Sequence, residues 1–299
     1  MMKYLISGGT GFIGSYIRPL LLKDGNYITI ITRSPEKYRG EKADNQQFIS
    51  WDGDLVKAAS EANVVMNLAG ENIFGFRWTD RVKKKIRDSR IQSTRKLVEA
   101  MEQAERKPEL FISASGVNFY KSQGDDVIDE SGVPGDDFLA QVCIDWELEA
   151  IKAQEFGVRT VIPRISPALQ DGGGMIEKMK LPFLLFAGGP LGSGKQYVPW
   201  IHMNDLCLAI RFPVTQPDFE GPYNACSPMQ VTMNELASAM GKTLNRPSFM
   251  RVPEFAMNLV LGEAASPVLG SLRVLPAKLL DNGFEFQFED LEEALADIL

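Results

Sequence analysis

Several residue types on which whole classes of proteins depend are scarce in this sequence. Among 299 residues there is one histidine, His202, and there are three cysteines, which stand far apart at Cys143, Cys207 and Cys226 and form no Cys-x-x-Cys pattern. This spacing argues against a disulfide framework and a zinc site, and a single histidine excludes a histidine-rich metal site. No Gly-x-Ser-x-Gly elbow supplies the nucleophile of a serine hydrolase. We therefore expect neither a metal site nor serine-hydrolase chemistry.

Excess positive charge and long apolar runs are missing as well. The formal net charge is −7 at pH 7, which argues against non-specific binding to nucleic acid and to anionic membranes. The longest apolar run, residues 181–189, is far shorter than the ~20 residues of a membrane-spanning helix. The N-terminal residues do not have the layout of a signal peptide. We expect a cytoplasmic protein that binds a small molecule and neither nucleic acid nor membrane.

Strand and helix patterns alternate through the first half of the chain. The expected strands span residues 3–7, 27–32, 46–51, 63–70, 109–115 and 159–166. The expected helices span residues 12–25, 79–104 and 137–156. Nearly continuous apolar strands separated by helices are typical of a parallel sheet covered on both faces. With right-handed crossovers, this pattern predicts a doubly wound α/β domain of the Rossmann type.

The composition changes after Ser166. The stretches 167–175 and 186–200 are rich in glycine and proline, with short apolar segments between them. We therefore divide the chain into a first domain, 1–166, and a smaller, loop-rich α/β region, 167–299, that binds the substrate. Parts of about 198–228 are expected to return to the sheet.

Four glycines crowd the turn that follows the first expected strand. Residues 5–14 read LISGGTGFIG, and Gly8, Gly11 and Gly14 form a Gly-x-x-Gly-x-x-Gly pattern between a strand and a helix. Glycines there permit a tight turn, let backbone N–H groups approach a diphosphate, and allow close packing of helix on strand. The pattern predicts dinucleotide binding, and the alternative is a plain glycine-rich turn.

The end of the second expected strand indicates which dinucleotide binds. An NAD site usually has an acidic residue there, whereas this chain has Thr32, Arg33 and Ser34. A guanidinium can stack on adenine and bind a 2′-phosphate through its paired N–H groups. The sequence therefore favours NADP(H), and the alternative for Arg33 is an ordinary surface arginine.

With these motifs, NLAG at 67–70 and SAS at 113–115, the chain resembles the extended short-chain dehydrogenase/reductase superfamily. Longer blocks are similar to its atypical, sugar-epimerase-like subgroup, which has a short C-terminal domain of its own; they are RWTD, RDSRIQSTRKLVEA, PGDDFLAQVCIDWE, GGPLGSGKQYVPWIHMNDL and RVLPAKLLDNGFEF. The resemblance implies a domain that binds NADP(H), with an unidentified substrate in the cleft to the C-terminal part. It leaves open a homodimer formed through two helices beside the sheet.

The resemblance also implies roles for individual residues. Ser115 matches the hydroxyl that binds the reacting oxygen of the substrate in related epimerases. The residues that match positions contacting the cofactor are Gly8, Thr10, Gly11, Phe12, Ile13, Gly14, Arg33, Ser34, Leu68, Ala69, Gly70, Ser113, Pro163 and Arg164.

One motif of the superfamily is absent. Its working members carry Tyr-x-x-x-Lys at the start of the helix after that serine; the tyrosine moves the proton, and the lysine lowers the tyrosine's pKa and holds the nicotinamide ribose. The best registers here pair Phe138 with Val142 or Leu139 with Cys143, so neither partner is present. Tyr120 is the candidate for a substitute catalytic acid, and a packing aromatic is the alternative.

Three further residues are candidates for contact with the substrate. Glu71 follows a strand at the edge where ligands of open α/β sheets bind, and the alternative is a solvated loop acid. The stretch 189–196, GPLGSGKQ, nearly spells an ATP-binding P-loop, but Gln196 stands where the Ser/Thr ligand of Mg²⁺ is required. We interpret it as a loop beside the cleft, where Lys195 and Gln196 meet a polar or anionic substrate.

Two functions from different classes explain an intact glycine turn without Tyr-x-x-x-Lys. The first is an NADP(H)-dependent oxidoreductase or nucleotide-sugar-epimerase-like enzyme acting on a carbonyl or alcohol, with Ser115 and a non-standard acid. The second is a binding protein that retains NADP(H), has lost turnover, and acts as a redox sensor or partner-binding module.

The substitution Arg33→Glu tests the choice of cofactor. A carboxylate at this position repels a 2′-phosphate, so NADPH binding should weaken far more than NADH binding. Fluorescence titration with each dinucleotide measures the two effects. An equal loss for both would contradict the assignment of Arg33 to the 2′-phosphate.

Overall fold

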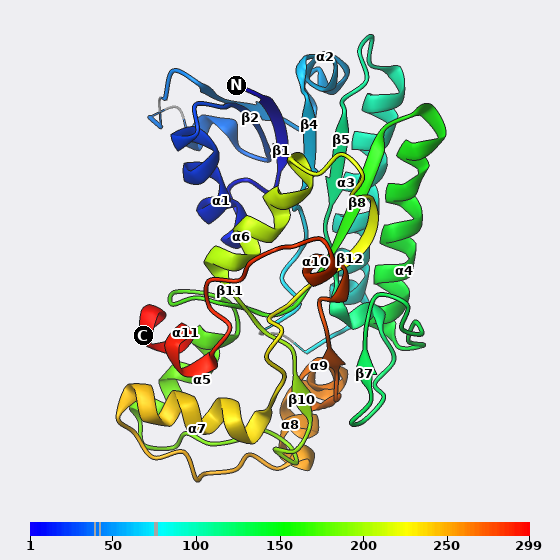
Figure 1. Ribbon diagram of the computed structural model, residues 1–299. Coiled ribbons are helices and arrows are strands. Elements are labelled where there is room, and N and C mark those ends of the chain that lie inside the picture. Colours follow the sequence, from blue (N-terminus) through cyan, green and yellow to red (C-terminus); the bar gives the residue numbers. More distant parts are fainter. Residues whose placement is uncertain (39, 42, 75–76) are drawn as a thin grey trace.

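A parallel sheet forms the centre of the computed structural model, which describes residues 1–38, 40–41, 43–74 and 77–299 (Figure 1). Across the sheet the strand order is β12-β8-β5-β4-β1-β2-β3, and every neighbouring pair is parallel. The direction of winding therefore reverses beside β1, as in a dinucleotide-binding fold, and the predicted doubly wound α/β class is confirmed. The strands are β1 (Lys3–Ser7), β2 (Tyr27–Thr32), β3 (Gln46–Ser50), β4 (Val64–Asn67), β5 (Leu110–Ser113), β8 (Arg159–Ile165) and β12 (Gly221–Ala225), with β6 (Ser115–Gly116) paired to β8.

Successive residues of each strand feed two separate cores, one on each face of the sheet. In β1, Ile6 packs with residues of α1 (Phe12–Lys23) and α6 (Met203–Arg211), whereas Leu5 packs toward the opposite face. That face is covered by α2 (Leu55–Glu61), α3 (Asp80–Gln103) and α4 (Phe138–Ile151). Because both faces are buried, the strands are nearly continuous apolar runs, which is why the sequence predicts them well.

The strand β12 comes from the second region of the chain. It lies within residues 198–228 and pairs in parallel with β8, at the edge of the sheet. The fully buried Tyr223 of β12 donates its hydroxyl to the carbonyl of Ala209 in α6, which ties this strand to the helix beside it. A sheet strand and a covering helix thus follow the boundary expected near residue 167.

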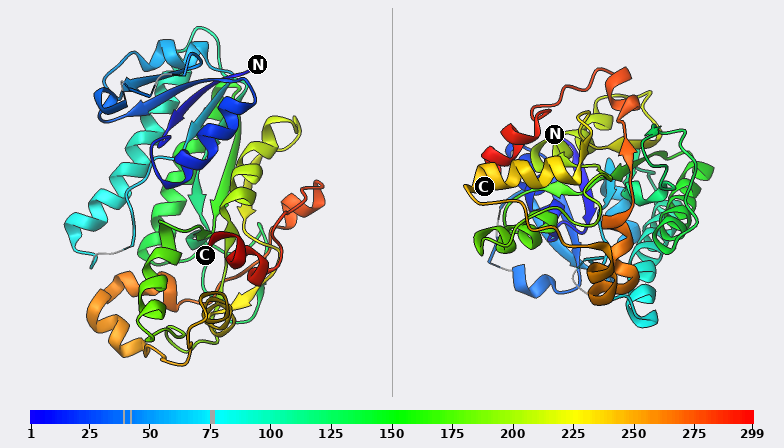
Figure 2. Two further views of the ribbon diagram at one scale, coloured as in Figure 1. Left: turned by 90° about the vertical axis from the view of Figure 1, so that its left-hand side faces the viewer. Right: turned by 90° about the horizontal axis from the view of Figure 1, so that it is seen from below.

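The rest of the second region forms a smaller layer at the carboxyl end of the sheet (Figure 2). Its core gathers around Trp200, Phe183, Leu236 and Leu295, all of which are fully buried. None of the helices in the described ranges combines the length and the hydrophobicity that a bilayer crossing demands.

The helices of this layer and its surroundings are α5 (Gly174–Leu184), α7 (Met233–Leu244), α8 (Glu254–Leu261), α9 (Ser266–Leu269), α10 (Ala277–Asp281) and α11 (Leu291–Ile298). The remaining strands form three short parallel or antiparallel pairs, β7 (Val127–Ile128) with β14 (Arg273–Val274), β9 (Ala168–Leu169) with β11 (Ile201–His202), and β10 (Tyr197–Val198) with β13 (Val231–Thr232).

Asp205 ties the C-terminal segment to the sheet layer. Its side chain is fully buried at the start of α6, and its two carboxylate oxygens accept the backbone N–H groups of Gln287 and Phe288, each at 2.9 Å. A carboxylate that accepts two backbone amides satisfies donors which would otherwise lie unpaired beside the core. These two hydrogen bonds to Asp205 therefore hold the segment before α11 against α6, which covers the sheet.

Replacing this carboxylate should destabilise the fold. Asp205→Ala leaves two backbone amides without their acceptor, and we expect the free energy of unfolding to fall by about 2 kcal/mol or more. Urea denaturation of the variant measures the change. Asp218→Ala, at an exposed position of the following loop, is the matched control and should leave the unfolding free energy within about 0.5 kcal/mol of the original. Equal stability of the two variants would contradict the proposed tie.

Candidate functional site

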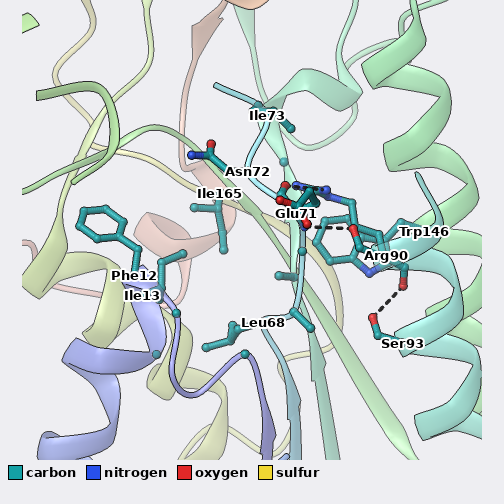
Figure 3. Close-up of a pocket in the computed structure, with 18 of the residues that line it drawn as sticks. Phe12, Ile13, Leu68, Glu71, Asn72, Ile73, Arg90, Ser93, Trp146 and Ile165 are labelled. Carbon is teal, nitrogen blue, oxygen red and sulfur yellow. Dashed lines mark hydrogen bonds between the residues drawn. The ribbon is translucent and has the colours of Figure 1, made fainter. Parts of the chain in front are cut away.

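A cleft of about 1360 Å³ opens where the parallel strands end. Its walls come from the segments that follow β1, β2, β4, β5 and β8, together with the inner faces of α3 and α4. In Figure 3, Phe12 and Ile13 lie on one side of the cleft and Arg90 and Trp146 on the other. Ligands of open α/β sheets bind at this edge, and the volume exceeds the ~300–1,000 Å³ of a usual small-molecule pocket. The cleft has room for a dinucleotide and a second small molecule.

The glycine turn after β1 is built for close backbone contact. Gly8 has φ of +72°, and a Cβ atom there would lie 2.5 Å from the carbonyl carbon of Leu68. A Cβ atom on Gly14 would lie 2.2 Å from the carbonyl oxygen of Gly8. Helix α1 begins after Gly11 without a side-chain cap, so the first N–H groups of the helix remain available to an anion. The geometry fits the predicted diphosphate site.

Arg33 stands at the β2 end of the cleft. It follows β2 directly, and the register of β2 with β3 brings it beside Trp51, which also lines the cleft. Ser34 is the next residue but is not among those lining the cleft. An aromatic ring and a guanidinium here suit an adenine that carries a 2′-phosphate. Trp51 was not predicted as a cleft residue, although a tryptophan as the last residue of an expected strand is a signal that the sequence contains.

The charge of the cleft is opposite in sign to the charge of the chain. Three acidic residues line it, Glu71, Asp88 and Glu177. The described residues contain no group of three or more His, Cys, Asp or Glu side chains suited to hold a metal ion. A surplus of cations makes the cleft attractive to an anionic ligand. The cations that line it are Arg33, Arg81, Lys84, Lys85, Arg90 and Lys96.

Ser115 lies at the cleft end of a buried polar chain. Its Oγ donates to Glu147 Oε1 at 2.7 Å. Arg164 donates to both oxygens of Glu147, from Nε at 2.9 Å and from Nη2 at 2.8 Å. Behind them, the Tyr120 hydroxyl accepts from Arg164 Nη1 at 2.8 Å and donates to Asn224 Oδ1 at 2.7 Å. Because the Ser115 hydroxyl donates its proton to Glu147, toward the cleft it can act only as a hydrogen-bond acceptor.

The structure contradicts the predictions for three residues, Tyr120, Arg164 and Pro163. Tyr120 is 3% exposed and does not line the cleft, and burial raises its pKa to about 12, so it does not serve there as a catalytic acid. Arg164 does not contact the cofactor site, because its guanidinium is committed to Glu147 and Tyr120. Pro163 is buried within β8 as well, and the part of this segment that lines the cleft begins at Ile165.

Helix α4 presents an apolar face to the cleft. Leu139, Val142, Cys143 and Trp146 line it, whereas Phe138 does not and instead packs edge-on against Trp78. Of the two registers considered, only Leu139 with Cys143 therefore has both residues at the cleft. Burial raises the pKa of the Cys143 thiol to about 11, which keeps it neutral. This helix offers neither a phenol nor a cation.

Other predicted residues divide between the cleft and its surroundings. Glu71 lines the cleft and is exposed. Ser113 is fully buried outside the lining, and its hydroxyl has no partner within the described ranges. The placement of Lys195 and Gln196 at the substrate cleft is wrong: Lys195 is exposed elsewhere, and the Gln196 amide donates to the carbonyl of Leu191 at 2.9 Å. Gln196 therefore stabilises the loop in which it lies, and this structural role accounts for its place in the near-P-loop pattern.

The largest omission from the sequence prediction is the inner face of α3. Arg90 and Lys96 line the cleft from this helix, as does Ser93. The spacing of Ile86 and Leu97, both buried, already places Arg90 on the inward side. The helical periodicity places Arg90 on the buried side of the helix, and a charged residue there indicates a functional position.

The glycine turn yields a direct test. In Gly14→Ala the new methyl group collides with the Gly8 carbonyl and displaces the N–H groups of α1, so NADPH affinity should fall roughly tenfold or more. The NADPH-induced rise in melting temperature, set against the melting temperature of the free variant, separates lost binding from lost folding. Gly40→Ala is the control, because no atom lies within 4 Å of a Cβ there. Unchanged NADPH affinity in Gly14→Ala would refute this role of the turn.

Comparison with known proteins agrees with this geometry. The family model described as the NAD dependent epimerase/dehydratase family matches residues 4–226, and a domain of unknown function, DUF1731, matches residues 252–298. The chain is 38% identical to the epimerase family protein SH2119 of Staphylococcus haemolyticus over 301 residues, which cover 100% of this chain and 99% of that protein. It is 37% identical to the chloroplastic SDR39U1 homolog of Arabidopsis thaliana, over 100% of this chain and 87% of that protein.

A solved structure is similar over the whole length. The human epimerase family protein SDR39U1, crystallised with NADPH, superposes with a TM-score of 0.89 at 32% identity and covers 99% of each chain. Sequence and fold thus agree from the first strand to the last helix. The chain belongs to the NAD-dependent epimerase/dehydratase family.

Proposed function

We propose that the cleft binds NADP(H) and that the protein is an oxidoreductase or nucleotide-sugar-epimerase-like enzyme acting on a carbonyl or alcohol. The glycine turn and the uncapped start of α1 would hold the diphosphate, and Arg33 the 2′-phosphate. The human relative was crystallised with NADPH, which supports this assignment. When bound, the cofactor supplies or accepts a hydride at nicotinamide C4.

The hydrogen bond from Ser115 to Glu147 is the observation that carries the catalytic part of the proposal. A substrate hydroxyl can donate to the free lone pair of Ser115 Oγ. As that alcohol is oxidised, its proton passes to Ser115 while the proton of Ser115 passes to Glu147. Arg164 donates to both oxygens of Glu147 and so holds the carboxylate in position to exchange a proton with Ser115. Reduction of a carbonyl runs the same two transfers in reverse.

A second function, binding of NADP(H) without turnover, has an observation in its favour. In the register whose two residues both line the cleft, Leu139 and Cys143 take the positions of the superfamily's tyrosine and lysine, and neither can move a proton at neutral pH. A protein with this face could report the redox state of the cofactor pool. The relay through Ser115 is what distinguishes the two proposals.

Transfer of a deuterium label separates them. NADPH carrying deuterium on one or the other face of nicotinamide C4 is incubated with a broad carbonyl panel, and the products are read by mass spectrometry. We expect transfer from one face only, and we expect Ser115→Ala to abolish it while NADPH binding persists.

The matched control is Ser113→Ala, which removes a buried serine hydroxyl of the neighbouring strand that does not line the cleft. It should retain transfer. Tight NADPH binding by the unaltered protein with no transfer to any compound would favour the sensor, and full transfer by Ser115→Ala would overturn the relay.

A further inference from the structure

The absence of a lysine on α4 leaves the cleft without a cation from that helix. In the register whose two residues both line the cleft, Cys143 has the lysine's position, and the other α4 residues that line the cleft are Leu139, Val142 and Trp146. In the superfamily that lysine holds the nicotinamide ribose. Another cation that reached the same place would have to come from a different element.

Arg90 reaches that place from α3. Both Arg90 and Cys143 line the cleft, and the Arg90 guanidinium is close enough to oppose the rise that burial and Glu147 cause in the pKa of the Cys143 thiol. Cys143 is in turn the neighbour of Ser115 and of Gly116. Arg33 lies at the opposite end, beside β3. Arg90 therefore stands at the end of the cleft where the chemistry would occur.

The guanidinium is fixed on three sides. Its Nη1 donates to the carbonyl oxygens of Glu71, at 3.1 Å, and Ile86, at 3.0 Å. Its Cζ lies over the Trp146 ring, 5.2 Å from the ring centroid. Figure 3 shows the two side chains on the same side of the cleft. Against Gly70, a Cβ atom would come within 3.1 Å of Arg90 Cζ. A side chain at residue 70 would therefore press on the guanidinium and force it to shift by a few tenths of an ångström.

The remaining donors of Arg90 have no protein partner in the described ranges. Nη1 makes both hydrogen bonds of the side chain, so Nε and Nη2 are left over, and no carboxylate there forms a salt bridge with it. Burial lowers the pKa of the guanidinium, and Cys143 and Glu71 only partly offset this effect. A desolvated guanidinium with free donors, held rigidly on a cleft wall, is arranged to bind oxygen atoms of a ligand.

We propose that Arg90 takes the place of the missing α4 lysine and holds the nicotinamide-side ribose of bound NADP(H) through Nε and Nη2. This inference rests on the proposed binding of NADP(H) in the cleft. The cation at this end of the cleft then comes from α3, and the α4 residues that line the cleft are apolar. The fork of the guanidinium also matches a pair of ribose hydroxyls better than an ammonium does.

Two cofactor fragments locate the contact. The first, 2′-phosphoadenosine 5′-diphosphate, ends at the second phosphate; the second, 2′-phosphoadenosine 5′-diphosphoribose, adds the distal ribose. By calorimetry, Arg90→Met should bind the first as the unaltered protein does and the second roughly ten- to a hundredfold more weakly, because a charged hydrogen-bonded contact is lost. Arg87→Met is the matched control, since Arg87 lies on the same helix, pairs with Asp145 and does not line the cleft.

A relocated charge tests the position itself. If Arg90 serves the site of Cys143, then Arg90→Met/Cys143→Lys should recover at least part of the affinity for the diphosphoribose, which a purely structural role of Arg90 does not predict. If Arg90→Met does not fold, the same two fragment titrations are repeated with Arg90→Lys. Equal losses for both fragments, or no loss for either, would overturn the proposal. If the unaltered protein binds neither fragment nor NADP⁺, the proposed function itself fails.

Discussion

The cleft depends on bare backbone pressed against bare backbone at the first crossover. Gly8 meets the carbonyl of Leu68, and Gly14 meets the carbonyl of Gly8, at distances that admit no side chain. The segment that begins at Leu68 continues to Gly70, whose free face meets the Arg90 guanidinium. One series of close contacts thus sets the position of the helix amides on one wall and of a cation on the other. Glycine is required because neither position has room for a Cβ atom and because Gly8 also has a positive φ, +72°.

Behind the cleft, a buried ion pair sets the orientation of Ser115. Burying charges is costly unless their hydrogen bonds are satisfied. Here all three nitrogens of the Arg164 guanidinium donate, to Glu147, to Tyr120 and to the carbonyl of Glu130. The Phe119 ring covers its face, with Cζ 3.6 Å from the ring centroid. The pair is therefore well compensated, and it couples β8 to α4 at the Glu147 end of the proposed proton relay.

The sequence predicted most of the fold and about half of the site, and the division has a physical reason. Continuous apolar strands and a glycine turn are local patterns, so β1, β2 and the loop were placed within a residue or two. The role of Arg164 depends on partners 17 and 44 residues away in the chain, which no local pattern reveals. The prediction for Lys195 is wrong because the near-P-loop pattern does not reveal that this loop folds on itself, with the Gln196 amide donating to the carbonyl of Leu191. The cytoplasmic location and the homodimer stay predictions.

The parallel sheet is shared between the two regions of the chain, and this has a consequence for how the protein can form. Until β12 is added, β8 is an edge strand whose backbone groups on that side are unpaired. A chain cut at residue 166 would therefore expose an edge strand that can pair with the strands of other molecules. The two regions of the chain thus share one sheet, and exchanging the C-terminal part as a separate module would mean replacing a strand of that sheet.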